Sequence, residues 1–475
     1  MTVTEGASAT ESAAEVTSRR VAWLPYAVFA VAVLGIYLLG RGDTGRQDPW
    51  LLVGLGSAVP LYIVARAWRL PTWMHIVALA LPVSILIVAA IHGYPEGAAR
   101  ASRYAYGAIL VLAFAAWATT PRRRVALAVA GGLLAVDQYI AGWYWWWGMD
   151  DPDALMLGMF GWHNQFGIYL AIGAALGAVV AMVETRVVML VGAVIVAFTT
   201  AGVAASGSRA NMALLVGALL VALVIGVVVH RWRALPRWVA LVGVSVGTVF
   251  LMRSPIFFST VEGSPLAMTE RGGFENSWVE RVEFWRVGLV MGIDHWFAGV
   301  GNANYGQNNV DYGAFAYSSH PHNELVLAWA ENGMLGLLPL LAAYLGGVWL
   351  IVRSIVRPLD AEPRRISWLP GRAELVGDPG RWAGLLALLV ALIHAFIDFD
   401  WAWPSICALV GLVAGLASAP LVAARAGRPT SSRALAVLNV GMVAVLLAAA
   451  VTGYVIDPLR LIPAMPVGGW PVIDR

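Results

Sequence analysis

The sequence contains no lysine and a single cysteine, and charged residues fill only 12% of its 475 positions. One cysteine, Cys407, cannot supply an intramolecular disulfide or a cysteine-rich metal site. So few charges, with 60% hydrophobic residues and a mean hydropathy of +0.73, exclude a soluble globular protein of this length. Strand-like alternation is also lacking, which excludes a membrane barrel. The composition therefore predicts an all-α polytopic membrane protein.

Apolar runs long enough to cross a hydrocarbon layer about 30 Å thick recur along the whole chain. We predict about 12–13 transmembrane helices, and the domain organisation follows from them. A disordered cytoplasmic tail at 1–20 precedes transmembrane helices 1–9 at 21–252, an extracytoplasmic loop at 253–321, transmembrane helices 10–13 at 322–455 and a C-terminal tail at 456–475. The thirteen spans are expected at 21–40, 50–65, 74–92, 104–120, 125–142, 165–183, 187–205, 210–229, 238–252, 323–352, 382–397, 405–424 and 434–454.

The placement of arginine orients these spans, because cytoplasmic loops near span ends hold an excess of positive charge. With the amino terminus inside, the cytoplasmic segments contain twenty arginines and the outer segments eleven. This bias puts residues 143–164, 206–209, 253–319 and 398–403 on the extracytoplasmic face of the cell membrane.

The long outer loop is expected to contain a short amphipathic helix resting at the membrane surface. The segment Ser277–Glu280 has capping-box spacing, which predicts that the helix begins there. Arg281 and Trp285 are four positions apart and would share one face, from which the arginine could reach a lipid phosphate. Further along, Gly299 and Gly301 predict a tight turn and a close approach of backbones.

The loop returns to the membrane through two histidines, His320 and His322. Asn323 or Glu324 is expected in the first turn of the next helix, whose positive dipole end would keep His322 neutral. A neutral histidine at the membrane surface can act as a general base. It can also simply cap the helix or hydrogen-bond to lipid headgroups.

Several other ionisable groups are predicted near this face. Arg209 and Arg281 suit a phosphate ligand, because guanidinium binds phosphate in bidentate fashion, although each could merely extend from a span end to the headgroups. Glu331 lies two to three turns into the next helix and needs an arginine such as Arg209, or water in a cavity, as a partner. Asp398 and Asp400 either orient substrate hydroxyls or end the eleventh span.

Two clusters of residues lie at the outer end of the fifth span, and each can be interpreted in two ways. The run Trp143–Trp147 is typical of an interfacial aromatic belt, and it could also be a stacking platform for sugar rings. Asp150, Asp151 and Asp153 fit an exposed turn or a site for a divalent cation.

Three blocks, in this order, resemble the O-antigen ligase and polymerase family: SGSRANMALLVGALL from Ser206, ERVEFWRVGLVMGIDHWFAGVGNANYG from Glu280 and HPHNELVLAWAENGMLGLLPLL from His320. A weaker upstream match, GWHNQFGIYLA, begins at Gly161. The members of this family are polytopic membrane glycosyltransferases of GT-C type.

The resemblance implies an enzyme that transfers a glycan from a polyprenyl diphosphate donor to an acceptor hydroxyl of a cell-envelope polysaccharide or glycolipid, with inversion and without a metal or other cofactor. By motif, Arg209 and Arg281 would hold the donor diphosphate, and His322 would take the acceptor proton. The expected partners are the lipid-linked donor, the acceptor and the bilayer, and no nucleic acid. Supporting roles would fall to His320, Asn323, Arg286, Glu331, His163 and Asn164.

The chain also departs from the family pattern. Pro321 separates the two histidines, no lysine assists, and the span count is slightly high. These departures leave open the choice between His320 and His322, the nature of the acceptor as glycan, lipid or protein, and the choice between ligase and polymerase. A secondary transporter with a basic outer vestibule for an anion is the competing class, and a non-catalytic scaffold is a third. Contacts that gather Arg209, Arg281 and His322 would favour the enzyme.

Overall fold

The computed structural model describes residues 23–40, 47–93, 96–148, 155–184, 186–252, 274–314, 317–356, 372–398, 401, 403–424 and 432–456. Within these residues the chain forms helices and turns and no strand, which confirms the all-α fold class. Seven helical stretches of this part are long and apolar enough to cross a membrane, and four shorter apolar helices accompany them. The protein is therefore a polytopic membrane protein.

Each of the thirteen predicted spans overlaps a helix. The bounds are α2 (Leu24–Gly40), α3 (Gln47–Val64), α4 (Thr72–His92), α5 (Glu96–Trp117), α6 (Pro121–Gly148), α7 (His163–Val183), α8 (Arg186–Ala205), α9 (Arg209–His230), α10 (Ala234–Met252), α11 (Phe274–Asp294), α12 (Tyr305–Asn308), α13 (Glu324–Val356), α14 (Arg372–Gly377), α15 (Pro379–Ala395), α16 (Pro404–Ala423) and α17 (Arg433–Ile456), with single 3-10 turns η1 (Ala67–Arg69), η2 (Gly158–Phe160) and η3 (Arg231–Arg233).

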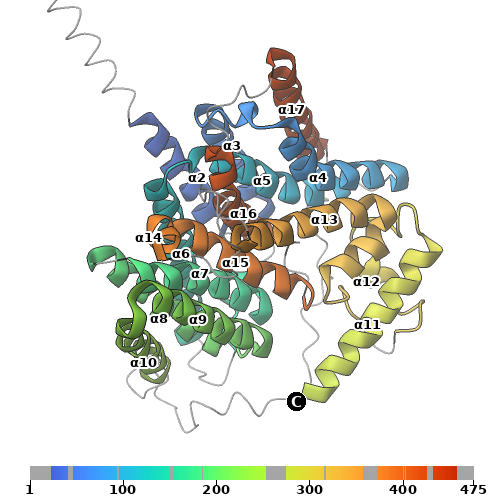
Figure 1. The fold of residues 1–475 in the computed structure, drawn as a ribbon. Helices are drawn as coiled ribbons and strands as arrows, with labels where there is room; N and C mark the ends of the chain where they lie inside the picture. Colours follow the sequence, from blue (N-terminus) through green and yellow to red (C-terminus); the bar gives the residue numbers. More distant parts are fainter. Residues whose placement is uncertain are drawn as a thin grey trace, which may run out of the picture.

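Helix α7 is the centre of the bundle, because every residue of Asn164–Val183 is buried. It packs against α6, α8, α9 and α15, which surround it in Figure 1. Small residues permit this packing: a Cβ placed on Gly173 would lie 2.2 Å from the Cβ of Ala135 on α6. The same packing fixes the amino end of α7, where His163 lies.

Polar contacts join helix ends that were predicted on the same side of the membrane. At the end predicted to be cytoplasmic, Arg124 forms a 2.7 Å salt bridge with Asp378, and the Asn439 amide donates to the Trp68 carbonyl at 3.0 Å. The segments predicted on the outer face contact one another in the same way, in the cluster described below. Which side faces the cytoplasm stays a prediction.

Helix α13 is broken, which corrects the expectation of an uninterrupted tenth span. Gly333 has φ 55° and ψ −148°, a backbone conformation open essentially only to glycine. The preceding loop covers the break: the Met334 N–H donates to the Trp296 carbonyl at 2.8 Å, and the Gly301 N–H donates to the Glu331 carbonyl at 2.9 Å. Backbone groups that the break would otherwise leave unpaired in a low-dielectric region are thus satisfied.

Helix α11 begins at Phe274, so the prediction of a start at Ser277 was wrong. No glycine or proline separates the two positions, and extending an existing helix by one turn costs little compared with starting one. The helix packs against α13, beside α12, as Figure 1 shows. One face of this helix is therefore occupied by protein.

The turn before α13 has the geometry predicted for it. Gly299 and Gly301 have φ values of 64° and 95°. A Cβ on Gly299 would lie 2.2 Å from the carbonyl carbon of Glu331, so the backbone of the turn rests directly on that of α13. The predicted tight turn and close backbone approach are confirmed.

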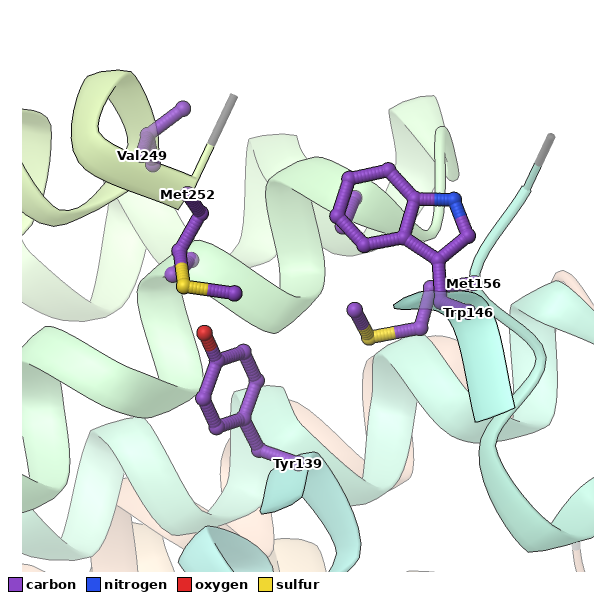
Figure 2. A pocket seen from close by; sticks show the side chains of 7 residues that line it. Tyr139, Trp146, Met156, Val249 and Met252 are labelled. Atoms are coloured by element: carbon purple, nitrogen blue, oxygen red, sulfur yellow. The ribbon is translucent and has the colours of Figure 1, made fainter. Parts of the chain in front are cut away.

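A small cavity of about 10 Å³ lies between α6, α8 and α10. Figure 2 shows the Tyr139 hydroxyl directed towards Met252, with Trp146 and Met156 on the other side. The Trp146 side chain is buried, so this member of the Trp143–Trp147 run belongs to the core rather than to an interfacial belt. At this volume the cavity holds at most about one water molecule.

Candidate active site

The predicted base, His322, is hydrogen-bonded to a carboxylate. Its Nδ1 lies 3.0 Å from Oδ1 of Asp398, just after α15. The Asp398 side chain is 1% exposed and the imidazole 17%, so water competes little for this contact. A carboxylate only accepts hydrogen bonds, so Nδ1 carries a proton, and in the neutral ring the lone pair is then on Nε2. The ring thus presents a proton-accepting nitrogen on the side away from Asp398.

The second carboxylate oxygen of Asp398 is held from the first turn of α7. The Asn164 amide donates to Oδ2 at 2.7 Å. Asn211, in the first turn of α9, donates to the backbone carbonyl of Asn164 at 2.9 Å and to the Ser208 hydroxyl at 2.8 Å. All of these polar side chains are buried. Asp398 is therefore fixed through both oxygens by the ends of other helices.

The backbone around His322 is held just as closely. Its φ of 53° is uncommon for a residue with a side chain, and such backbone conformations cluster at functional sites. Asn323 caps α13, accepting from the N–H groups of Leu325 and Val326 at 2.9 and 3.0 Å. Its amide also donates to the Phe396 carbonyl at 2.9 Å. The cap joins the start of α13 to the end of α15, on either side of the His322–Asp398 contact.

Arg281 belongs to the same cluster. It is half-buried on α11, and its charge, like that of Asp398, acts on the ring of His163. Trp285 donates from Nε1 to the backbone carbonyl of His322 at 3.3 Å. The face that Arg281 and Trp285 were predicted to share is therefore turned towards this cluster.

The other two arginines of the predicted site lie differently. Arg209 is the first residue of α9 and is exposed, two positions before Asn211. Arg286 is exposed on another face of α11, where it pairs with Glu283 at 2.7 Å and donates to the Gly313 carbonyl at 3.3 Å. Arg209 thus lies at the helix end that contributes Asn211 to the cluster, whereas Arg286 lies outside the cluster.

A buried charged pair borders the cluster. Glu331 forms a salt bridge with Arg100 of α5, and its other oxygen accepts from the backbone N–H of Tyr305 at 3.3 Å. Arg209 is not this partner, contrary to the expectation. The positive charge of Arg100 also lowers the pKa of His320. Arg100 was not among the predicted site residues, and its position in a predicted outer connection, before an apolar run, is the one signal for it in the sequence.

His320 contacts a hydroxyl through Nδ1, the nitrogen with which His322 contacts a carboxylate. The ring of this half-buried histidine lies 2.8 Å, through Nδ1, from the hydroxyl of Ser319. Surrounding protein excludes water from the ring of His320, and the positive charge of Arg100 disfavours a second positive charge beside it. The pKa of His320 therefore lies well below its ordinary value. The geometry therefore favours His322 over His320 as a base.

Acidification is expected to destabilise the turn that carries His320. Because its folded-state pKa lies below the unfolded value of about 6.5, the ring takes up a proton on unfolding. The free energy of unfolding should therefore fall as the pH drops below about 6.5, by at most about 1.4 kcal/mol per pH unit. Thermal unfolding in detergent at several pH values measures this decline. His320→Gln should flatten it, whereas the same change at the exposed His295 should not; equal curves for both would contradict the assignment.

The acidic residues predicted at two span ends cannot be placed relative to this cluster. Asp150, Asp151 and Asp153 lie outside the described residues, as does Asp400. Among the residues that the structure does describe, no three histidine, cysteine, aspartate or glutamate side chains gather as a metal site would require.

One family model matches part of the chain. Residues 192–341 match the model of a family described as O-Antigen ligase. This segment is similar to that family. It contains Arg209, Arg281 and His322, whereas Asn164 on α7 and Asp398, just after α15, lie outside the matched residues. The contacts of His322 with Asp398, and of Asp398 with Asn164, thus extend beyond the matched segment.

Other comparisons add nothing to this assignment. No curated protein matches the chain. Among solved structures, the human organic anion transporter MFSD10 (TETRAN) is similar at 14% sequence identity, over 82% of this chain and 99% of that one, with a TM-score of 0.14. At a TM-score this low, the similarity supports no conclusion about the fold or the activity of this protein.

Proposed function

We propose that the protein is a membrane glycosyltransferase that moves a glycan from a polyprenyl diphosphate donor to an acceptor hydroxyl during assembly of an envelope polysaccharide or glycolipid. The cell membrane is its location, and the cluster around His322 works on the extracytoplasmic face. The observation that carries the proposal is the 3.0 Å contact between His322 and Asp398, beside the segment that matches the O-antigen ligase family. A neutral histidine whose Nδ1 proton is held by a carboxylate has its lone pair on Nε2, which is the arrangement that general-base catalysis requires.

In the proposed reaction, the acceptor hydroxyl gives its proton to Nε2 of His322. The acceptor oxygen then forms a bond to the anomeric carbon while the bond from that carbon to the diphosphate oxygen breaks. The electron pair leaves with the diphosphate, and attack from the opposite side inverts the anomeric centre. Asp398 stabilises the positive charge that appears on the imidazole, because it is buried against the ring. Release of polyprenyl diphosphate and of the proton restores the site.

The arginines neutralise the departing diphosphate in this scheme. Arg281 stands in the cluster with His322 and His163, and Arg209 starts the helix whose Asn211 holds Asn164. Guanidinium donors matched to phosphate oxygens stabilise negative charge as it develops, and a low surrounding dielectric strengthens them.

Arg281→Gln is expected to weaken donor binding about 10- to 100-fold, because each hydrogen bond to a charged group contributes about 1.5–3 kcal/mol. Equilibrium binding of a radiolabelled polyprenyl diphosphate to the purified protein measures the change. Arg286→Gln is the matched control, since it removes the same charge from an exposed position on the same helix. Equal donor affinities for the two variants would remove Arg281 from the donor site.

The activity itself is tested with purified protein in nanodiscs, supplied with lipid diphosphate-linked oligosaccharides and an extract of envelope acceptors. Transfer predicts two coupled products, free polyprenyl diphosphate and an acceptor of increased mass. A ladder of lengthened donor glycans would identify a polymerase of the same family. Flux of an anion across vesicles, with neither product formed from any donor, would replace the enzyme with a secondary transporter.

A further inference from the structure

We propose that a groove whose charged end lies at the opposite end of the bundle binds one anionic glycerophospholipid, with its phosphate between Arg69 and Arg353. A cavity of about 1060 Å³ lies between α4, α5, α13, α15, α16 and α17. It runs from η1 and the end of α13 towards Trp401 and Cys407, at the start of α16. The proposal does not depend on the role assigned to His322.

The charge of the groove is concentrated at one end. Arg69 and Arg353 line it there, and no aspartate or glutamate is found among the described residues of its wall. The Nε of Arg353 is buried and has no hydrogen-bond partner within the described part of the chain. A buried guanidinium N–H without an acceptor is costly, and a phosphate oxygen would satisfy it.

Aromatic side chains frame this charged end as they do at membrane interfaces. The Arg353 guanidinium lies 5.4 Å from the ring centroid of Trp349, and that of Arg69 lies 4.6 Å from Trp68. Trp73, which also lines the groove, is half exposed, as is Trp349. Indole rings favour the headgroup level, so this end is placed where a lipid phosphate lies.

Beyond the arginines, the wall of the groove is mostly apolar, with leucine and valine beside small residues of α13 and α16. Such a wall suits acyl chains, and basic pockets between transmembrane helices bind anionic lipid headgroups. The two arginines carry two positive charges and meet no acidic group of the described wall, so a headgroup with net negative charge is favoured over a zwitterionic one.

Native mass spectrometry of the delipidated full-length protein tests the headgroup. The probes are phosphatidylglycerol and phosphatidylcholine with identical acyl chains. One phosphatidylglycerol should bind in preference, and Arg69→Gln with Arg353→Gln should weaken it at least about tenfold, since each such charge contributes about 1 kcal/mol. Arg122→Gln with Arg233→Gln is the matched control, because both are exposed, lie on the predicted same side and are outside the groove.

The acyl chains are tested separately at Gly346. This residue lines the groove, and a Cβ on it would meet nothing within 4 Å, so Gly346→Phe adds a side chain in open space without a clash. The variant keeps both arginines and should still lose most of the bound phosphatidylglycerol. Its thermal unfolding should match that of the wild type, which separates displacement of lipid from misfolding.

Three results would overturn the proposal. Phosphatidylglycerol binding that resists both the arginine pair and Gly346→Phe would place the lipid elsewhere. Equal binding of the two phospholipids would remove the role of the net charge. The third result is displacement of phosphatidylglycerol by a polyprenyl monophosphate that binds equally well to the wild type and to the double arginine variant. That result would mean that the groove binds an isoprenoid chain instead.

Discussion

Asp398→Asn is expected to slow transfer about 10⁴-fold, which is the loss that follows when the carboxylate behind a catalytic histidine becomes an amide. The surroundings of Asp398 supply the reason. Asn164 donates to one of its oxygens at 2.7 Å, so an amide placed there must keep its oxygen on that side. Its NH₂ would then face Nδ1 of His322 and donate to it. The imidazole proton would move to Nε2, where the acceptor proton has to go.

Single-turnover kinetics in nanodiscs measure this loss, alongside His322→Ala, which should cost about 10²- to 10⁴-fold. The double variant should be scarcely worse than the worse single one, because the two residues act as a unit. His320→Ala is the matched control and should stay within about tenfold of the wild type, below the range expected for a general base. Losses that multiply in the double variant, or an inactive His320→Ala, would contradict the assignment.

Arg100→Met is expected to destabilise the protein by about 3–5 kcal/mol, the cost of leaving one buried charge without its partner. Glu331 is 1% exposed and would keep only the backbone N–H of Tyr305 as a donor. Changing both residues, Arg100→Met with Glu331→Gln, should recover most of the loss, because no uncompensated charge is then left in the bundle.

Unfolding in mixed micelles, read as the denaturant midpoint, distinguishes these variants. Arg209→Met serves as the control for removal of an exposed arginine and should change stability by no more than about 1 kcal/mol. Equal destabilisation by the single and the double variants would mean that Arg100 acts through packing and not through its charge.

Much of the fold follows from local patterns. Long apolar runs predicted the helices, because a segment in a bilayer must satisfy its own backbone hydrogen bonds. The spacing of Arg281 and Trp285 predicted a shared face, since residues four apart in a helix are neighbours. The pair of glycines around Val300 predicted the turn that rests on α13. Each of these inferences needed only residues close together in the sequence.

The remaining features depend on residues that are distant in the chain. Glu331 and its partner Arg100 are 231 positions apart, and only the tertiary fold brings them together. Gly333 gave no local warning of that break, because glycine is frequent in membrane helices and its φ is decided by the turn that packs on it. In the sequence, Asp398 is one of two acidic residues at a span end. Its hydrogen bond to His322 is a tertiary contact, which the sequence around Asp398 does not predict.

The wide spacing of the cluster also has a consequence for biosynthesis. Asn164 and Asp398 are separated by 234 positions, so at about 5–20 residues per second the ribosome needs roughly ten to fifty seconds to supply the second after the first. His322 is made 76 positions before Asp398, so for roughly the last four to fifteen seconds of that interval it is without its carboxylate. A nascent chain, or a chain truncated before Asp398, is therefore expected to be inactive. Lipid-linked glycan is then consumed only by protein whose synthesis has passed α15.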